Sequence, residues 1–559
     1  MANQGTILKY VYELERKRGG DLWFTQPMGG GRVKTYTFGE AIEEARRVAA
    51  FLDEMNLEKG SKIILCSKNT AWWIIADLAI WMAGHVTVPI YPTLTDATVR
   101  YIVDHSEAKL AFIGKLDDWA MMADGFPPEL RKVEMPLGPG IGAEKWEDIV
   151  KRFAPLPGTP DRDPEELGTI VYTSGTTGKP KGVMLSFKAM LASAEGFADA
   201  IGVTRNDRML SYLPLAHVFE RACVECTGIV GGCQIFFAES LDTFVQDIQR
   251  ARPTVFISVP RLWLKFQAGV FAKMPPEKLD KLLRIPIVNK LVKKKVLKGL
   301  GLDQVRLAGS GSAPTPPELI AWYHKLGLVL TEGYGMSENF SYSHINMPND
   351  IRVGYVGKNQ KGVETRISEI GEIEIKSPAA MMGYYKDEEA TRAVFTPDGF
   401  FKTGDRGELD SEGRLRITGR VKEIFKTSKG KYVAPAPIES EILVHPMIEQ
   451  ACVCGAGFPQ PFALVVLTED AARRRNGPER KQIEDSIKAH VQAVNAKLDP
   501  HEQLDFVTIV NDQWTVENDL LTPTMKLRRT AVEDKYLGRA ESWAAKKQQV
   551  IWEDEALAS

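Results

Sequence analysis

The segment YTSGTTGKPKGV, which begins at Tyr172, combines the residue types that bind phosphate groups. Its glycines can expose consecutive backbone N–H groups, its lysines carry positive charge, and its hydroxyl groups are hydrogen-bond donors or metal ligands. It is not a Walker A loop, because the first glycine of that motif would fall on Thr173 and Lys179 is followed by Pro180. We therefore predict a phosphate-binding loop of another kind. The alternative is a solvated turn between a strand that ends near Tyr172 and a helix that begins near Ser186.

Two other glycine-rich segments, AGSGSAP (308–314) and TEGYGMSE (331–338), indicate a site for a flat ligand such as adenine. Glycine lets the backbone approach a ligand closely, and Tyr334 offers a ring face for stacking. Glu338 ends the second segment, where a carboxylate fits a magnesium site better than it fits a helix cap.

Cys223 and Cys226 have a spacing that is found in metal and redox sites, and Cys233 lies nearby. Their surroundings, RACVECTGIVGGCQIFF, are small and apolar, and no second pair with this spacing follows. We therefore expect buried cysteines in a core helix and strand. His217 in LPLAHVFE is interpreted as a residue that lines the site, with a purely structural role as the alternative.

The elements that position these residues must come from more than one domain, because the chain has 559 residues. Its 71 Lys and Arg residues are balanced by 73 Asp and Glu residues, which argues against nucleic acid as a partner. The amino terminus has no apolar run typical of an export signal, which predicts a cytoplasmic protein. The apolar stretch AWWIIADLAIWMAG (71–84) is too short to span a bilayer and predicts a buried helix, capped by Asn69 or Thr70 and ended at Gly84.

Short β-branched segments such as SKIILC, HVTVPIY, TVFISVP and QVRLAG alternate with helical patterns such as FGEAIEEARRVAAFLDEM. This alternation predicts an α/β fold with largely parallel sheets. After Gly419 a lysine-rich connector leads to the strand-like segments CVCGAG and FALVVL and to a charged helix around ERKQIEDSIKAHVQAV. We predict a large domain over residues 1–419, a connector at 420–426 and a small α+β domain over 427–559.

The string TSGTTGKPKGV closely resembles the signature of the adenylate-forming enzymes, which include acyl-CoA synthetases, luciferases and the adenylation domains of peptide synthetases. Seven further strings follow in that family's order: LPLAHVFE, AGSGSAP, TEGYGMSE, FKTGDRG, GRVKEIFK, GKYVAP and LTPTMKLRR. The resemblance covers nearly the whole chain. It implies a large multi-sheet N-terminal domain that binds ATP and the acyl group, with a small mobile C-terminal lid. It also implies that a carboxylate attacks the α-phosphorus of ATP, pyrophosphate departs, and a thiol accepts the acyl group.

The resemblance assigns residues to the triphosphate and to a metal ion. Thr173 holds Mg²⁺ together with Glu338, as hard oxygen ligands beside phosphate and water. The residues that embrace the phosphates are Thr173, Ser174, Gly175, Thr176, Thr177, Gly178 and Lys181.

The adenosine site is implied in the same way. Tyr334 lies against the base, Asp405 binds the ribose, and Ser337 lies near the α-phosphate. Most members of the family have threonine where Ser337 stands, a difference that keeps the hydroxyl group. The remaining residues of this site are Gly311, Ser312, Ala313, Pro314, Glu332, Gly333 and Gly335.

The connector becomes a hinge in the family, although its basic residues alone would also fit a solvated surface turn. Arg420 then contacts ribose or phosphate, Lys422 lies at the pivot, and Lys426 belongs to the cofactor site. Gly430 lines a tunnel for the pantetheine of CoA in a second orientation of the lid. Lys526 places its ammonium between the substrate carboxylate and the α-phosphate, which makes it the main catalytic residue, with Arg420 and His217 beside it.

The acid that is activated is harder to predict. The segment IPIVNKLVKKKVLKGLGLDQVRLAGSGSAP resembles long-chain fatty acyl-CoA synthetases, which implies a long-chain fatty acid as substrate, with ATP, Mg²⁺ and CoA. In its first part Val288, Leu291, Val292 and Val296 recur near helical spacing among lysines 290 and 293–295, so this helix could rest on an anionic bilayer. The preferred alternative is a surface helix packed on its own domain.

Two other functions stay open. The first is an adenylate-forming ligase for a medium-chain or aryl acid, or one with a carrier protein as acceptor. The second, from a different class, is a nucleotide-binding regulator that has lost catalysis. The joint presence of Thr173, Glu338, Asp405 and Lys526 argues against this regulator.

Overall fold

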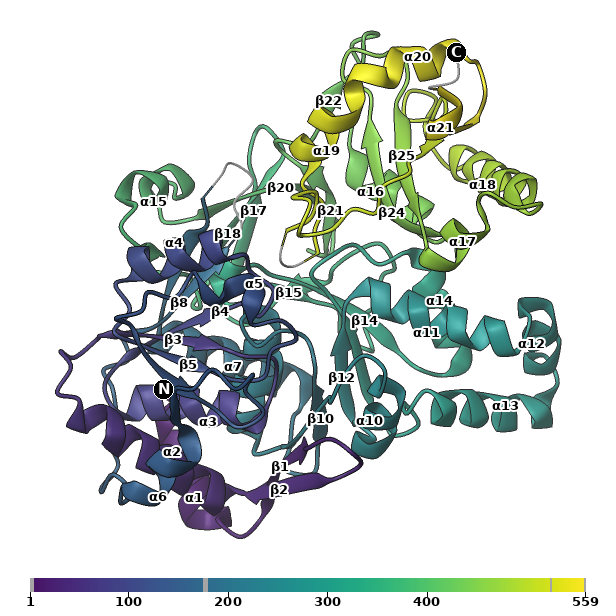
Figure 1. Ribbon diagram of the computed structural model, residues 1–559. Helices are drawn as coiled ribbons and strands as arrows, with labels where there is room; N and C mark the ends of the chain where they lie inside the picture. Colours follow the sequence, from purple (N-terminus) through teal and green to yellow (C-terminus); the bar gives the residue numbers. More distant parts are fainter. Residues whose placement is uncertain (1–4, 174–178, 523–524, 557–559) are drawn as a thin grey trace.

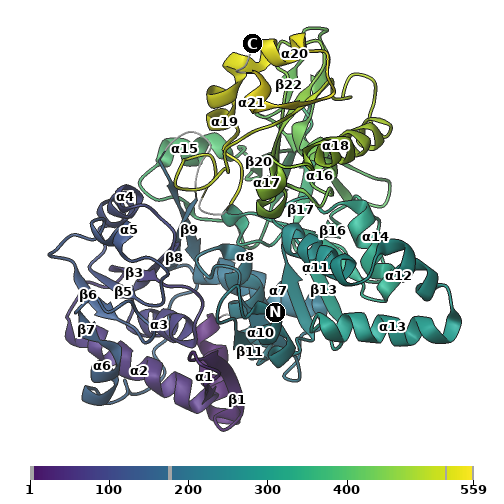
Figure 2. The ribbon, with the colours of Figure 1, turned by 45° about the vertical axis from the view of Figure 1, so that its right-hand side comes forward.

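The computed structural model describes residues 5–173, 179–522 and 525–556. Figures 1 and 2 show a large body that contains the N-terminal part of the chain, with a smaller C-terminal domain, coloured from green to yellow, above it. The predicted α/β architecture with a small α+β domain at the C-terminus is confirmed.

An eight-stranded sheet forms the centre of the large domain, in the order β19-β9-β8-β4-β3-β5-β6-β7. Strands β3, β4, β5 and β6 pair in parallel, whereas β8, β9 and β19 pair antiparallel. The strands are β3 (Lys62–Cys66), β4 (Val86–Ile90), β5 (Leu110–Ile113), β6 (Arg131–Glu134), β7 (Glu144–Lys145), β8 (Leu167–Thr173), β9 (Lys181–Ser186) and β19 (Gly383–Tyr384).

Two further sheets belong to the large domain, and in the first of them the glycine-rich segments AGSGSAP and TEGYGMSE begin on β13 and β14. One has the order β12-β13-β14-β15-β16, and its first three strands are parallel. The other, β10-β11-β1-β2, is parallel except for its edge pair β1 and β2. The strands are β12 (Val255–Ser258), β13 (Leu307–Ser310), β14 (Leu330–Tyr334), β15 (His344–Ile345), β16 (Lys358–Asn359), β10 (Arg208–Ser211), β11 (Gln234–Phe237), β1 (Leu22–Pro27) and β2 (Val33–Thr37).

The fourth sheet departs from the predicted parallel pattern. Strands β17 (Glu364–Ile367), β18 (Glu372–Lys376), β20 (Phe401–Leu409) and β21 (Leu415–Arg420) are all antiparallel. Tight turns at Gly371 and Gly413, both with positive φ, join neighbouring strands, and such hairpins need no crossover helix. This sheet carries Asp405 and Arg420 on adjacent strands.

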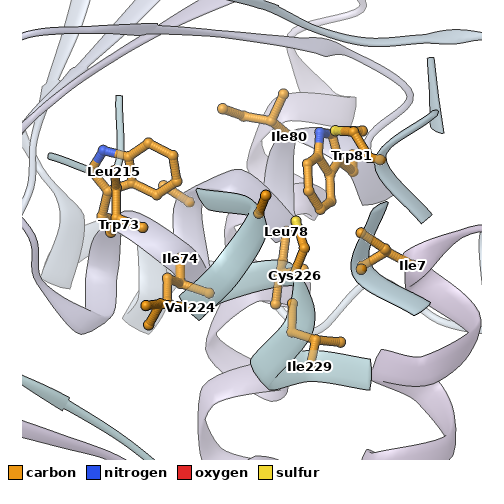
Figure 3. Close-up of a cluster of buried hydrophobic side chains, with 14 of the residues drawn as sticks. Ile7, Trp73, Ile74, Leu78, Ile80, Trp81, Leu215, Val224, Cys226 and Ile229 are labelled. Carbon is orange, nitrogen blue, oxygen red and sulfur yellow. The ribbon is translucent and has the colours of Figure 1, made fainter. Parts of the chain in front are cut away.

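The predicted apolar helix is α3 (Ala71–Met82), and all of its residues are buried. The Thr70 hydroxyl caps it by accepting a hydrogen bond from the Trp73 backbone N–H, and Gly84 with φ +84° follows its end, as predicted. Figure 3 shows Trp73 and Trp81 of α3 among aliphatic side chains from neighbouring elements. The helix is therefore part of the core. Among the described residues, none of the helices combines the length and apolar character needed to cross a bilayer.

One group of charged side chains is sealed inside this apolar core. Arg221, Asp77 and Glu225 are all fully buried. The Arg221 Nε lies 3.1 Å from Asp77 Oδ2 and 3.3 Å from Glu225 Oε2. Arg221 Nη1 also donates to the Thr169 hydroxyl at 2.6 Å. The guanidinium lies 5.4 Å from the ring centroids of both Trp73 and Trp81. The contact between Arg221 and Asp77 ties α3 to the π-helix Arg221–Cys226.

The cysteines are buried, as expected from their apolar surroundings. Cys223 and Cys226 lie in the π-helix, and Cys233 directly precedes β11. Burial raises the pKa of the Cys233 thiol to about 12. These three side chains therefore belong to the core.

The C-terminal domain is built around the mixed sheet β24-β25-β26-β27, with the hairpin β22-β23 before it. The strands are β24 (Ile448–Cys454), β25 (Phe462–Leu467), β26 (Val507–Ile509), β27 (Val550–Trp552), β22 (Phe425–Lys426) and β23 (Tyr432–Val433). The larger helices are α16 (Pro435–Ile442), α18 (Arg480–Asn495) and α19 (Arg529–Tyr536). The predicted charged helix is α18, and its buried face is Ile483, Ile487, Val491 and Val494.

Three helices extend from the side of the large domain: α11 (Pro260–Lys273), α12 (Pro276–Leu283) and α13 (Pro286–Gly299). In both ribbon views α13 lies at the right-hand edge of the molecule. Val292 and Val296 of α13 pack against a cluster that includes Leu279 and Leu283 of α12. Val292 and Val296 of the predicted apolar stripe therefore pack on their own domain. Leu291 does not belong to that cluster, and its side chain is 67% exposed.

Candidate active site

A single cleft of about 3340 Å³ lies between the large domain and the C-terminal domain. Most of the predicted site residues line it. They are Thr173, Lys181, His217, Ser312, Ala313, Pro314, Glu332, Gly333, Tyr334, Gly335, Ser337, Glu338, Asp405, Arg420, Lys422 and Lys526. Residues 174–178 of the phosphate-binding string lie outside the described residues. Lys426 and Gly430 lie exposed on the β22-β23 hairpin and are not among the lining residues.

Asp405 is the centre of a hydrogen-bonded group at the wall of the cleft. The Tyr334 hydroxyl donates to Asp405 Oδ2 at 2.5 Å, and Arg420 Nη1 donates to Oδ1 at 2.9 Å. Asp405 and Arg420 are direct partners in the β20-β21 ladder, so the antiparallel register sets their contact. Burial raises the pKa of Asp405, and the Arg420 charge opposes that rise.

Lys526 reaches this group from the C-terminal domain. Its loop is closed at the base by a bridge between Leu521 and Leu527, and the Thr522 N–H donates to the Lys526 carbonyl at 2.8 Å. The side chain is exposed to the cleft, and the cleft walls surround it. Desolvation by these walls lowers the pKa of Lys526, the positive Arg420 lowers it further, and two carboxylates oppose the change.

The two carboxylates are those of Asp405 and Glu338, so Lys526 lies within the field of both the predicted ribose ligand and the predicted metal ligand. The loop therefore brings a flexible cation of one domain to an acidic wall of the other. A cation in this position can stabilise negative charge that develops on a ligand in the cleft.

Thr173 and Glu338 offer oxygen ligands of the kind that Mg²⁺ prefers. Glu338 Oε1 accepts a hydrogen bond from the Tyr384 hydroxyl at 3.0 Å, and both Thr173 and Glu338 line the cleft. Among the described residues, no group of three His, Cys, Asp or Glu side chains could hold a metal ion. The pair therefore fits a Mg²⁺ ion whose remaining ligands are phosphate oxygens and water.

The described ends of the phosphate-binding string lie on an antiparallel hairpin. Thr173 ends β8 and Lys181 begins β9, and the two residues are paired in the ladder. Sequence interpretation missed β9, because KGVMLS was included in the turn that leads to the helix at Ser186. The Lys181 ammonium lies 4.0 Å from Asp387 and 5.0 Å from the ring centroid of Tyr384. The hairpin thus directs a positive charge to the side of the cleft where Glu338 lies.

In the predicted adenine site two glycines are needed for different steric reasons. A side chain at Gly311 would come within 3.1 Å of the Phe219 ring and 3.3 Å of the Gly333 carbonyl, so the space beside β13 is narrow. A side chain at Gly335 would meet the backbone of Ser341 at 2.3 Å, so this glycine is required by internal packing. Ser312 has φ +66°, a strained conformation typical of ligand-binding turns.

Glu332 on β14 is almost completely buried at the same wall. The Thr315 N–H donates to Glu332 Oε1 at 3.2 Å, whereas Oε2 has no hydrogen-bond partner among the described residues. Burial raises the pKa of Glu332 to about 7. This carboxyl group is therefore partly protonated near neutral pH, and its Oε2 is buried without a hydrogen-bond partner among the described residues.

His217 is fixed at the start of a short helix. Its Nδ1 accepts a hydrogen bond from the Phe219 N–H at 3.1 Å, so the ring proton is on Nε2. Burial and the nearby Lys526 charge lower the pKa of His217 to about 3. The imidazole is thus neutral at physiological pH, which suits a wall residue and a hydrogen-bond donor rather than a cation.

Apolar side chains of the large domain also line the cleft, and together they form its apolar arm. Its walls come from α7 (Phe187–Ile201), the π-helix, β12, β13 and α11. The lining side chains include Phe197, Cys223, Ile257, Leu307, Phe271 and Ala272. Because these apolar side chains line the same cleft as the charged group, they can contact the hydrocarbon part of a ligand whose polar end lies at Lys526.

Sequence interpretation missed two residues of the site. The Tyr384 hydroxyl donates a hydrogen bond to Glu338, and the Lys181 ammonium lies over the Tyr384 ring. Tyr384 comes from β19, which is far from both residues in sequence. Arg529 of the LTPTMKLRR string lines the cleft and donates to Glu439 Oε1 at 2.6 Å. The only sequence feature that could have indicated a role for Arg529 is its position three residues after Lys526 in the same string.

Comparisons with known proteins agree with this geometry. Residues 16–385 match the AMP-binding enzyme family, and residues 422–544 match the AMP-binding enzyme C-terminal domain. The long-chain-fatty-acid–CoA ligase FadD15 of Mycobacterium bovis is 33% identical, and the alignment covers 96% of each chain. Fatty acyl-CoA synthetase A of Dictyostelium discoideum is 30% identical over 90% of this chain and 85% of its own.

A solved structure shows the same fold. The crystal structure of the anthranilate CoA ligase AuaEII with anthranoyl-AMP superposes with a TM-score of 0.79 at 20% identity. The match covers 96% of this chain and 99% of that chain. At this level of identity the similarity concerns the fold alone.

Proposed function

The chain belongs to the AMP-binding enzyme family, and from this premise we propose that it is an ATP-dependent long-chain fatty acid:CoA ligase. It converts the acid to an acyl-adenylate and then to acyl-CoA, releasing pyrophosphate and AMP. The observation that carries the proposal is the position of Lys526, which the C-terminal domain places beside Asp405 and Arg420 in a cleft with an apolar arm.

In the first half-reaction a carboxylate oxygen of the acid bonds to the α-phosphorus, and the bond from that phosphorus to pyrophosphate breaks. Lys526 stabilises the negative charge that the acid carboxylate and the α-phosphate bring together. Asp405 accepts hydrogen bonds from ribose hydroxyls, and Arg420 holds the Asp405 carboxylate in place. Lys181 and the string that precedes it bind the β- and γ-phosphates.

Thr173 and Glu338 would hold a Mg²⁺ ion, which would neutralise part of the triphosphate charge when bound. Tyr384 orients the Glu338 carboxylate through its hydrogen bond. The Ser337 hydroxyl lies next in sequence to Glu338 and is proposed to face the α-phosphate.

In the second half-reaction the CoA sulfur bonds to the acyl carbon, the bond to AMP breaks, and the thiol proton leaves with solvent. We propose that residues 420–426 form the hinge between the domain at 1–419 and the lid at 427–559. Lys422 lines the cleft in the present orientation, whereas Lys426 and Gly430 lie outside it. Rotation of the lid about Lys422 would withdraw Lys526 and bring Gly430 to a tunnel for pantetheine.

The long-chain acid is favoured by the apolar arm and by the relatives, which are named for long-chain or fatty acids. A ligase for a medium-chain or aryl acid is the alternative. A long-chain acid also partitions into bilayers, and peripheral contact with a membrane is part of the proposal.

The test is an assay of the purified protein with palmitate, ATP, Mg²⁺ and CoA. We expect AMP, pyrophosphate and a thioester, and we expect rates to fall when octanoate or benzoate replaces palmitate. ADP and phosphate as products would contradict the mechanism, and a preference for benzoate would contradict the substrate. No acid-dependent turnover of ATP would support a regulator instead.

A further inference from the structure

We propose that helix α13 and the turn before it form a docking surface for an anionic lipid bilayer. The proposed docking surface consists of Ile285, Ile287, Leu291, Lys290, Lys294, Lys295 and Lys298. It rests on the proposed function in one respect, because a long-chain acid gives the protein a reason to visit a membrane. Its contacts and charges are independent of that function.

The first observation is the exposure of aliphatic side chains on the outer face of α13. Ile287 is 80% exposed, Leu291 is 67% exposed, and Ile285 in the preceding turn is 47% exposed. None of the residues of α13 is fully buried, although Val292 and Val296 contact α12. Ile287 and Leu291 are one helical turn apart and therefore share a face, which lies opposite the face that packs on the domain.

The second observation is the charge around these side chains. From Arg284 to Gly301 the chain has six basic residues and no acidic residue. Among the described residues, the structure gives no ion pair to any of these basic side chains. Lys294 and Lys298 lie on the same face as Ile287 and Leu291, with Lys290 and Lys295 at its two sides. The chain as a whole has a net charge of −2, so this local excess is not a general property of its surface.

Charge complementarity identifies the occupant. Lysines that surround exposed aliphatic residues match the interface of a bilayer with anionic headgroups, where the aliphatic groups enter the acyl boundary and the ammonium groups stay at the headgroups. A polyanion such as nucleic acid would leave Ile287 and Leu291 in water. A second copy of the chain would have to place two equal sets of lysines against each other, which costs free energy.

The third observation is the position of this surface relative to the cleft. Phe271 and Ala272 at the end of α11 and Pro276 at the start of α12 line the cleft. Phe271 also packs in the same cluster as Val292 and Val296 of α13. One layer of side chains therefore separates the docking surface from the lining of the cleft. A bilayer bound to α13 would lie beside the part of the protein that receives an acyl chain.

The experiment measures binding to vesicles made of equal parts phosphatidylglycerol and phosphatidylcholine, by flotation of the full-length protein. We expect wild-type protein to float with these vesicles at low salt and to stay in solution with pure phosphatidylcholine. The double variant Lys294→Glu/Lys298→Glu should lower vesicle partitioning by about 10²-fold. The double variant Ile287→Ser/Leu291→Ser should also lower it, even though its charge is unchanged.

A matched control reverses two other exposed lysines that precede β3 and β5 in the chain and do not belong to the docking surface, Lys59 and Lys109. Lys59→Glu/Lys109→Glu should bind vesicles within about threefold of wild type, because the net charge changes equally but the docking surface is intact. Equal loss of binding in this control would show that only net charge matters and would overturn the proposal.

Ligase activity with palmitate carried by albumin separates the two proposals. All variants should keep the wild-type rate in that assay, because none of the substituted residues lines the cleft. Wild-type protein that is active but does not float would overturn the docking surface alone, whereas inactive wild type would overturn the function. Light scattering that shows a dimer only when Ile287 and Leu291 are intact, without vesicle binding, would assign the surface to a second copy.

Discussion

Lys526 brings a positive charge from the C-terminal domain to the charged end of the cleft. Asp405 and Glu338 belong to the large domain and Arg420 is the first residue of the proposed hinge, and the three hold Lys526 in a field of mixed sign. The position of this ammonium in the cleft thus depends on the orientation of the two domains. The positions of the residues of the predicted adenosine site do not depend on that orientation.

We expect Lys526→Ala to lower the rate of adenylate formation by about 10² to 10³, the usual cost of losing one preorganised charge-stabilising group. Single-turnover formation of acyl-adenylate from palmitate and ATP measures this step. Thioester formation from supplied acyl-adenylate and CoA should stay close to wild type. If both rates fall together while the melting temperature is unchanged, Lys526 acts in both half-reactions and the account of the lid is wrong.

Glu332 gives a pH-dependent prediction. Its pKa is raised by burial to about 7, so the carboxyl group loses its proton as pH rises through neutrality. A negative charge at this wall disfavours a polyanionic nucleotide, so the KM for ATP should rise above pH 7 in the wild type. Glu332→Gln has nearly the same shape and no charge, and its KM for ATP should not show this rise. A rise of the same size in the variant would assign the titration to another group.

The melting temperature of Glu332→Gln as a function of pH tests whether the pKa of Glu332 is raised in the folded state. In an unfolded chain Glu332 titrates near 4.5, whereas the folded pKa is about 7. The folded state therefore holds more protons between these values, and stability is lost as pH rises from 4.5 through 7. We expect the melting temperature of Glu332→Gln to exceed that of the wild type increasingly over this range. A constant difference would contradict a buried, titrating carboxyl group.

At the scale of elements, the loop of Lys526 is anchored where α19 begins. Arg529 Nη1 donates to the Val453 carbonyl at 2.8 Å, Nη2 donates to Glu439, and Nε lies 3.7 Å from Glu423 within the proposed hinge. Nearby carboxylates raise the pKa of Arg529 despite its burial. Arg529 therefore acts as a positioning residue that joins the loop, the sheet and the hinge.

We expect Arg529→Gln to lower the rate of adenylation by about tenfold with little change in the KM for ATP, because the nucleotide wall stays intact. Arg473→Gln is the matched control, since Arg473 pairs with Glu469 at the surface of the same domain and does not line the cleft. That control should keep its activity. A rise in the KM for ATP with an unchanged maximal rate would mean that Arg529 contacts the nucleotide instead.

Many elements could be predicted from the sequence where short-range signals are enough to define a helix or strand. Helix α3 is an apolar run with a threonine cap and a glycine stop, and all three signals agree with the structure. Strand β9 was missed because its residues continue a polar turn and its partner is β8, which no local pattern reveals. Tyr384 was missed for the same reason, since only the pairing of β19 with β9 brings it to Glu338.

At the scale of the whole molecule, ion pairs between the two domains hold the present orientation. Lys497 of the C-terminal domain lies 2.6 Å from Glu318 on α14 (Pro317–Leu326) of the large domain. Arg261 on α11 forms a second pair with Glu449 on β24. Both pairs must break if the lid rotates, so they favour the orientation in which Lys526 reaches the cleft.

We expect Glu318→Lys to slow adenylation about two- to fivefold, the scale of an exposed ion pair, and to leave thioester formation unchanged. The effect should fade at high ionic strength because salt screens exposed charges. Glu58→Lys, a charge reversal at an exposed site away from the lid, should have no effect. An effect of Glu318→Lys that persists in high salt would point to a local packing defect.

The buried group of Asp77, Arg221 and Glu225 restricts how this sequence can change over evolutionary time. Loss of Arg221 alone would leave two buried carboxyl groups without their cation, at a cost of about 3 to 5 kcal/mol, which is a large part of the stability of a typical domain. Replacement of all three by well-packed apolar residues can cost nothing. We therefore expect descendants of this sequence to lose the three side chains together or to keep Arg221 with a carboxyl partner, so that the three positions covary among its homologues.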